Sequence, residues 1–229
     1  MPPSADTLSV VVLGASGAVG SEAVKALLAM PAVAKVTLLN RRALSLLESP
    51  RMSQHIVDPL DPASYRHLLA GHTAAICTLG VGQPSKVSKD ELVRIDKTAA
   101  LEFARACKDA GVQRFELLSA VGADPKSSNH YLRTKGELRD ALQALDFARL
   151  SSFQPSMILT PTNRYDRLQG MLLAVWPRLS PVLGGGLSKY RGIKVETLGA
   201  AMALNLVRTG RGFEVLHWSE MTTITGRAT

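Results

Sequence analysis

The sequence predicts an α/β protein built around a doubly wound parallel sheet. Three observations support this fold class: strand-like apolar runs alternate with helix-like segments, the first strand runs into a glycine-rich turn, and a helix follows that turn. Single helices between strands are typical of right-handed βαβ crossovers, which produce parallel sheets. The 229 residues are enough for one such domain with a sizeable core.

The first two predicted strands flank the first predicted helix. Leu8–Leu13 is a short β-branched apolar run that ends at glycine, as expected of a buried parallel strand. Ala18–Met30 is expected to be helical, because its apolar positions share one face and Pro31 ends the segment. Lys35–Leu39 is the second predicted strand.

The later elements continue the same alternation. The further predicted strands are His55–Val57, Ala74–Leu79, Arg114–Ser119, Ala148–Phe153 and Phe213–Trp218. The further predicted helices are Pro62–Ala70, Ser88–Ala110, His130–Leu145, Arg164–Val175 and Val195–Arg208. In the longest of these helices, Ser88 is the expected N-cap with Glu91 as its capping-box partner, and Gly111 is the expected stop.

Composition excludes several classes of protein. Hydrophobic residues make up 46% and charged residues 20% of the chain, as in soluble globular proteins. Two cysteines cannot form a disulfide framework, and Met1–Thr7 lacks the features of a signal peptide. We therefore expect a cytoplasmic protein with reduced thiols. The apolar stretch Met171–Trp176 is too short to span a bilayer, so no integral membrane segment is expected.

The net charge of +8 comes from basic residues scattered along the chain, and aromatic residues are only 5% of it. Without a basic run or a stacking platform, we expect no nucleic-acid partner. A pocket for an anionic cofactor together with a basic surface accounts for the charge. The five histidines show no spacing typical of metal ligands, so no metal is expected.

The segment GASGAVG, which follows the first strand and opens the first helix, predicts a dinucleotide site. Gly14 permits a tight turn, Gly17 lets a pyrophosphate approach the backbone, and Gly20 allows the helix to pack close to the strand. Free N–H groups at the helix N-terminus favour phosphates. The expected loop contacts of this Rossmann-like site are Gly14, Ala15, Ser16, Gly17, Ala18, Val19 and Gly20.

The residues after the second strand predict which dinucleotide binds. An NAD-specific site usually has an acidic residue here for the ribose 2′-hydroxyl, whereas this chain has Asn40, Arg41 and Arg42. Guanidinium groups pair with a 2′-phosphate through charge-assisted hydrogen bonds. The sequence therefore predicts NADP(H), held by Arg41 and Arg42.

Other strand ends supply further candidate cofactor contacts. Asp58 either accepts from the adenine amino group or caps the helix that begins near Pro62, and the sequence favours neither interpretation. Near the expected point where the strand order reverses, and after the sixth strand, backbone is expected to line the cofactor site at Thr78, Leu79, Gly80 and Pro155.

Tyr131 and Lys135 form a Y-x-x-x-K pattern on a predicted helix, where residues four apart share a face. The ammonium favours the phenolate form of the tyrosine, which then exchanges a proton with a carbonyl or alcohol during hydride transfer. Lys135 can also bind the nicotinamide ribose. Ser119, at the end of the fifth strand, can donate to the substrate oxygen. These residues predict an NADP(H)-dependent oxidoreductase acting on a small carbonyl or alcohol.

Four segments together resemble the atypical or extended branch of the short-chain dehydrogenase/reductase superfamily: GASGAVG, KVTLLNRR, CTLG and LLSAVGADPKSSNHYLRTKGELR. Within it, the chain resembles the HIV Tat-interactive protein oxidoreductase family, over nearly its whole length. The resemblance implies NADPH as the cofactor. It also implies that Ser119, Tyr131 and Lys135 are the family's serine, tyrosine and lysine.

The chain departs from the superfamily pattern at three places. Ala120 follows Ser119 where relatives often have consecutive serines, and the helix Ser88–Ala110 lacks the asparagine of a proton relay. Residues 154–157 read Gln-Pro-Ser-Met in place of Arg-Pro-Gly. These departures leave a second hypothesis open, a non-enzymatic regulator that binds NADPH.

The pattern of elements changes after Pro155, where prolines and glycines interrupt the alternation. We therefore expect residues 1–154 to form the NAD(P)-binding domain and residues 155–229 a small substrate-side cap integrated with it. A sugar-nucleotide epimerase or dehydratase is a third hypothesis, but it needs a larger substrate domain than these residues provide. The substrate, the direction of the reaction and the oligomeric state stay open.

Overall fold

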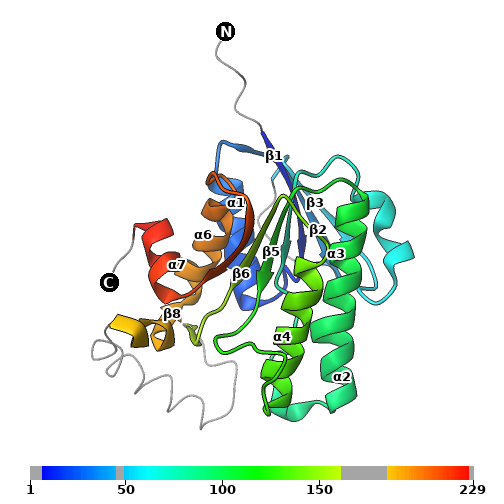
Figure 1. Cartoon of the computed structure of the whole chain (residues 1–229). Helices are drawn as coiled ribbons and strands as arrows, with labels where there is room; N and C mark the ends of the chain where they lie inside the picture. Colours follow the sequence, from blue (N-terminus) through cyan, green and yellow to red (C-terminus); the bar gives the residue numbers. More distant parts are fainter. Residues whose placement is uncertain (1–6, 45–48, 161–184, 227–229) are drawn as a thin grey trace.

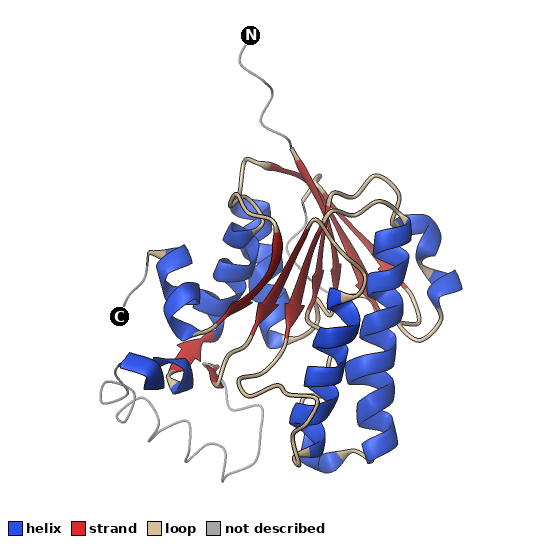
Figure 2. Cartoon of the chain, viewed as in Figure 1, coloured by secondary structure: helices blue, strands red, loops and turns tan. Residues whose placement is uncertain are grey.

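The computed structural model describes residues 7–44, 49–160 and 185–226. Within these residues a seven-stranded sheet runs in the order β3-β2-β1-β4-β5-β6-β9, and all its pairs are parallel (Figures 1 and 2). The strands are β1 (Leu8–Leu13), β2 (Val33–Asn40), β3 (Met52–Ile56), β4 (Ala74–Cys77), β5 (Arg114–Leu118), β6 (Arg149–Phe153) and β9 (Gly212–Leu216). The order reverses between β1 and β4, which confirms the predicted doubly wound, Rossmann-like sheet.

Helices cover both faces of the sheet (Figure 2). On one face lie α1 (Ala18–Ala29), α6 (Val195–Asn205) and α7 (Trp218–Thr225), and on the other lie α3 (Ala100–Asp109) and α4 (His130–Gln143). Two hydrophobic cores result. In β1, Val10 and Val12 enter the first core while Val11 and Leu13 enter the second. Burial of both faces explains why the strand is apolar throughout rather than alternating.

Residues 88–110 form one continuous helical rod, but the structure differs from the predicted uniform α-helix. The rod begins as α2 (Lys89–Val93), continues as the π-helix η4 (Arg94–Ala99) and ends as α3. Ser88 is the N-cap as predicted, since its Oγ accepts from the N–H of Glu91 at 3.1 Å. Gly111 ends the rod as predicted with a φ of +86°.

The prediction of one helix over Pro62–Ala70 is wrong. The segment forms two short 3-10 helices, η1 (Pro62–Ser64) and η2 (Arg66–Leu68). Tyr65 separates them with a φ of −135°, which an α-helix does not allow, while its side chain is fully buried. Burial of this ring in the second core therefore overrides the local helical pattern.

The C-terminal region contributes to two sheets. Strand β9 is the edge strand of the main sheet and helix α6 packs on one face of it. In contrast, β7 (Met157–Leu159) pairs with β8 (Gly192–Lys194) in a separate parallel pair. The 3-10 helix η6 (Gly185–Tyr190) precedes β8. Helix α7, after β9, was not predicted from the sequence. The predicted helix Arg164–Val175 lies outside the described residues, and a cap role for this region stays a prediction.

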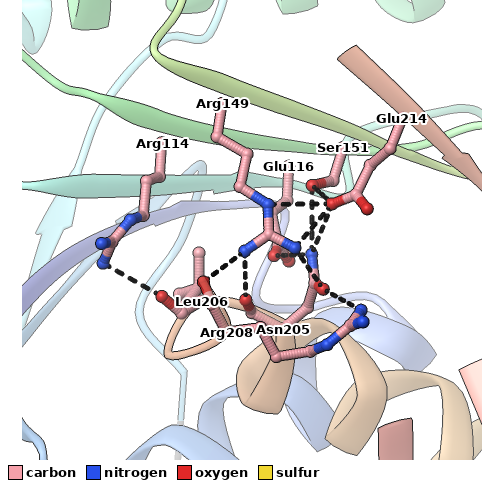
Figure 3. A network of polar contacts seen from close by, with 8 residues as sticks. All are labelled: Arg114, Glu116, Arg149, Ser151, Asn205, Leu206, Arg208 and Glu214. Atoms are coloured by element: carbon pink, nitrogen blue, oxygen red, sulfur yellow. Dashed lines mark hydrogen bonds and ion pairs between the residues drawn. The ribbon is translucent and has the colours of Figure 1, made fainter. Parts of the chain in front are cut away.

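Helix α6 packs directly on α1. At Gly199 of α6, a Cβ atom would lie 2.6 Å from Cβ of Glu22, so only glycine allows this approach. The C-terminal end of α6 is held by polar contacts, which Figure 3 shows between its last turn and strands β5, β6 and β9. The helix is therefore held by α1 near its middle and by the strands at its C-terminal end.

Arg149 lies at the centre of these polar contacts (Figure 3). Its guanidinium donates to Oδ1 of Asn205 at 2.9 Å and to Oε1 of Glu214 at 2.7 Å, and it reaches the carbonyls of Asn205 and Arg208. Asn205 in turn donates to Oε1 of Glu116 at 3.0 Å and to Oγ of Ser151 at 3.0 Å. Buried polar groups are stable when they are paired in this way.

Glu116 is the exception within the network. Its side chain is 2% exposed, and its Oε2 has no hydrogen-bond partner among the described residues. Burial raises the pKa of the Glu116 carboxyl well above its usual range, although the hydrogen bond from Asn205 and the charge of Arg149 act against the shift. The folded state therefore favours the protonated carboxylic acid.

Glu116→Gln should change how stability depends on pH. The unfolded chain loses the Glu116 proton near its usual pKa, and the folded chain only at a higher pH. The free energy of unfolding contributed by this proton is therefore complete below the usual glutamate pKa and is lost as pH rises through the raised one. Glutamine removes this loss, so urea unfolding should show the variant gaining on the wild type between pH 4.5 and pH 8.

The matched control is Glu22→Gln, because Glu22 forms a partly exposed ion pair with Lys25 on α1. Its difference from the wild type should stay nearly constant over the same pH range. An equally constant difference for Glu116→Gln would show that Glu116 is already ionised in the folded protein.

Candidate functional site

The glycine turn after β1 brings α1 close to the end of β4. Gly14 has a φ of +98°, and its carbonyl accepts from Oγ1 of Thr78 at 3.0 Å. A Cβ at Gly14 would lie 2.7 Å from the backbone of Thr78 and Leu79, and one at Gly20 would lie 2.3 Å from the carbonyl oxygen of Gly14. No side chain fits at either position, so the predicted reasons for these two glycines are both seen in the packing.

The N-terminus of α1 is open for an anion. Gly17 is its N-cap and no side chain caps the helix, while Ser16 and Gly17 are both exposed. The first turn carries no acidic residue that would repel a phosphate. Uncapped N–H groups and the helix dipole favour negative charge at this point, which fits the diphosphate of a dinucleotide.

A cavity of about 440 Å³ starts at this helix N-terminus and extends to β5 and α4. It brings together candidate residues that are far apart in the sequence. Those that line it are Ser16, Gly17, Ala18, Val19, Gly20, Thr78, Leu79, Gly80, Ser119, Tyr131 and Lys135. The parallel sheet explains this convergence, because the carboxyl ends of β1, β4 and β5 share one edge.

Ser119 directly follows β5, where its backbone N–H donates to the carbonyl of Phe153 at 2.7 Å. Its side chain is 5% exposed, and Oγ has no hydrogen-bond partner among the described residues. An unpaired buried hydroxyl costs free energy unless a ligand completes its bonding. Since Ser119 lines the cavity, this hydroxyl can bond to a molecule bound there.

Tyr131 and Lys135 lie on the first turns of α4, one turn apart as predicted. Asn129 caps this helix by accepting from the N–H of Leu132 at 3.2 Å. The ammonium of Lys135 lies 5.8 Å from the centre of the Tyr131 ring, and both side chains line the cavity. Tyr131 is half-buried, whereas Lys135 is only 4% exposed. The phenol can therefore reach a molecule in the cavity while the ammonium acts from its wall.

The predicted cofactor residues outside the cavity lining are of three kinds. Within the loop, the carbonyl of Gly14 accepts from the N–H of Gly17 at 3.0 Å and Ala15 is buried, while the carbonyl of Pro155 accepts from the N–H of Val121 at 3.0 Å. Arg41 and Arg42 are exposed directly after β2. Asp58 is exposed beyond the end of β3.

One interpretation of Asp58 is corrected by the structure. Its Oδ1 accepts from the N–H of Leu60 at 2.9 Å within its own turn, whereas Asp61 caps the 3-10 helix at Pro62 by accepting from Ala63. Asp58 is therefore not the cap, because it lies one turn too early in the chain. The adenine interpretation of Asp58 stays a prediction.

The structure adds residues that the sequence interpretation missed. The cavity is also lined by Ile158 in β7 and Thr160 just after it, and by Val81, Gly82 and Pro84 after β4. Above all it adds Asp96, whose Oδ1 lies 2.8 Å from the Lys135 ammonium. Asp96 lies in the middle of a helix, so no strand end or glycine marks it, and only the fold brings it to the site.

A second cavity, of about 590 Å³, adjoins the first. The two share Pro84 and Tyr131, so the phenol lies where they meet. The walls of the second cavity come from residues 84–92 and from the start of α4, and include Val87, Leu92 and His130. A molecule in the second cavity can therefore reach Tyr131 without entering the glycine turn.

Comparison with known proteins identifies the family. A family model described as NAD(P)H-binding matches residues 14–163. Rat protein HTATIP2 is 35% identical over 206 residues, which are 89% of this chain and 83% of the rat protein. Protein fmp52, mitochondrial, from Emericella nidulans is 30% identical over 155 residues, 66% of each chain.

Solved structures share the fold at low sequence identity. MoeE5, in complex with UDP-glucuronic acid and NAD, has a TM-score of 0.70 at 21% identity, covering 95% of this chain and 82% of that chain. The oxidoreductase ylbE from Lactococcus lactis has a TM-score of 0.69 at 15% identity, covering 96% of this chain and 97% of that chain. These likenesses show the fold alone.

The cytoplasmic location expected from the sequence is contradicted by these comparisons. Relatives from Emericella nidulans, Scheffersomyces stipitis and Lodderomyces elongisporus are named as mitochondrial proteins. Reduced cysteines and the lack of a secretory signal do not separate the two compartments, which is why the inference failed. In the part of the chain that the structure describes, no helix combines the length and apolar character needed to cross a membrane.

The predicted resemblance is confirmed by two independent matches, a family model that covers more than half of the chain and a relative that aligns over most of both proteins. The fold and the open N-terminus of α1 agree with it. The chain belongs to the NAD(P)H-binding Rossmann family that includes rat protein HTATIP2.

Proposed function

We propose that this protein is an NADP(H)-dependent oxidoreductase that transfers a hydride to or from a small carbonyl or alcohol substrate. The observation that supports the proposal is the single cavity lined by the N-terminus of α1, Ser119, Tyr131 and Lys135. Bound cofactor supplies or accepts the hydride. The family match supports dinucleotide binding, while the reaction itself is inferred from the side chains.

Each of the three side chains has a distinct role in this proposal. Tyr131 exchanges a proton with the substrate oxygen, because its phenol reaches both cavities. Ser119 donates its unpaired hydroxyl to the same oxygen and stabilises the charge that develops there. Lys135 holds its ammonium beside the phenol and donates to hydroxyl groups of the cofactor ribose.

The second cavity is the proposed place for the body of the substrate. It meets the first at Tyr131, and its apolar wall includes Pro84, Val87 and Leu92. Its polar wall includes Lys89 and Asn129, and no acidic residue lines it among those described. Such a lining suits a carbonyl compound with an apolar part and excludes a strongly cationic one.

NADP(H) rather than NAD(H) is proposed from Arg41 and Arg42. Both are exposed directly after β2, on the same sheet edge as the glycine turn, and β2 pairs with β1 along its length. A guanidinium at this edge attracts a 2′-phosphate, and the chain offers no acidic residue at these two positions that would repel it.

Two other functions are outcomes of the tests below. A regulator that binds NADPH without turnover is favoured by Ala120 after Ser119, because only one serine is available at the end of β5. Action on a sugar nucleotide is suggested by the ligand of MoeE5. A carbonyl panel that includes a UDP-sugar distinguishes the three functions.

Tyr131→Phe should lower kcat for NADPH oxidation by about 100-fold or more, with any carbonyl that the wild type reduces. Binding of NADPH, followed by its fluorescence, should be nearly unchanged, because the phenol does not hold the diphosphate. Tyr65→Phe is the matched control, since the buried Tyr65 hydroxyl has no partner among the described residues and lies in the second core. Turnover retained by Tyr131→Phe would rule out the proposed proton transfer.

Replacing both Arg41 and Arg42 with glutamine should raise the Kd for NADPH by about 10-fold to 100-fold, as expected for lost charge-assisted hydrogen bonds of roughly 1.5–3 kcal/mol. The Kd for NADH should change little. Arg105→Gln is the control, because Arg105 pairs with Glu102 on the surface of α3. Equal loss of affinity for both cofactors would contradict the proposed 2′-phosphate contact.

A further inference from the structure

Asp96 lies at the candidate site and within the π-helix η4. In a π-helix one extra residue enters the turn, which shifts the side chains that follow, and such turns are frequent at functional sites. Asp96 lies inside η4, its side chain is 1% exposed, and it lines the 440 Å³ cavity. A uniform α-helix over residues 88–110, which the sequence predicts, would direct this region differently.

Both oxygens of the Asp96 carboxylate are held. Oδ1 lies 2.8 Å from the Lys135 ammonium, and Oδ2 accepts from the N–H of Val81 at 2.7 Å. Gly80 leaves room for this arrangement, since a Cβ there would lie 3.0 Å from Oδ1. The carboxylate is therefore fixed between the loop after β4 and helix α4, and its orientation toward Lys135 is determined from both sides.

The titratable groups in and around the Asp96–Lys135 ion pair come from three elements. Tyr131 and Lys135 lie on α4, Asp96 lies on η4, and Cys77 lies at the end of β4. Burial raises the pKa of the Cys77 thiol to about 11, so Cys77 carries no charge near neutral pH. Asp96 is thus the anion that balances the Lys135 ammonium in the described part of the site.

The charge on Lys135 depends on that balance. Burial lowers the pKa of the Lys135 ammonium, but the charges of Tyr131 and Asp96 and the hydrogen bond to Asp96 outweigh burial and raise it above its usual value. An ammonium buried without a partner would lose its proton at a lower pH. The Asp96 carboxylate also offsets part of the field that the Lys135 ammonium exerts at the Tyr131 phenol.

We propose that Asp96 is a positioning residue that keeps the Lys135 ammonium charged and fixed at the cavity wall. The Asp96–Lys135 pair then holds the site in the charge state that carbonyl reduction requires. This inference rests on the proposed function for its second half only. Asp96 does not touch the reacting atoms in this proposal, and it acts through Lys135.

The first test measures Lys135 itself by NMR in cofactor-free protein labelled with [ε-¹³C]lysine, with Lys135→Met to assign the signal. In the wild type the ammonium should titrate above free lysine, and in Asp96→Asn at least one pH unit below the wild type. Glu137→Gln is the matched control, because it breaks the 2.6 Å Lys97–Glu137 ion pair between the same two segments. That variant should leave the Lys135 titration in place.

Two results would overturn the positioning role of Asp96. One is an Asp96→Asn protein in which Lys135 titrates as in the wild type. The other is a wild-type Lys135 that titrates below free lysine, and this result needs no variant, so the test survives if Asp96→Asn does not fold. Neither readout requires turnover, so a failure of the proposed oxidoreductase function remains distinguishable.

The second test is the pH profile of kcat/KM for NADPH oxidation with a carbonyl that the wild type reduces. Loss of the Asp96 charge favours deprotonation of Lys135, and the proposed reduction uses Lys135 in its charged form. The alkaline limb should therefore move to lower pH in Asp96→Asn and stay in place in Glu137→Gln. A lower rate with an unmoved limb would assign Asp96 a structural role and contradict the proposal.

Discussion

The close approach of α1 to the end of β4 is the constraint on which the site depends. Gly14 and Gly20 leave room for it, since a Cβ at either residue would lie within 2.7 Å of neighbouring atoms, and the hydroxyl of Thr78 closes the contact on the carbonyl of Gly14. This contact places the uncapped N-terminus of α1 at the edge where the parallel strands end. The open N–H groups and the catalytic candidates therefore meet at one cavity.

Two buried charged networks lie at different places in the same fold. Arg149, Asn205 and Glu214 join the last turn of α6 to the strands, and they stabilise the sheet without reaching the cavity. Asp96 and Lys135 join η4 to α4 and line the cavity directly.

The family and the geometry answer different questions. Membership of the NAD(P)H-binding family accounts for the glycine turn and the doubly wound sheet. The side chains around the cavity carry the proposal for a reaction, because a Rossmann fold hosts many functions. The second cavity, which meets the first at Tyr131, gives the proposed substrate a place, and its uncharged and basic lining narrows the substrate chemistry.

The sequence by itself determined the order of elements and the loop, because apolar periodicity, glycine spacing and caps such as Ser88 are local signals. It also identified Ser119 from its place at a strand end, and Tyr131 and Lys135 from their spacing of four residues on one helix. Only the tertiary structure decided that Tyr65 interrupts a predicted helix and that β9 pairs with β6 at the edge of the main sheet. It also decided that Asp96, within the π-helix η4, pairs with Lys135. These features depend on packing between residues distant in the chain, and no local pattern records such contacts.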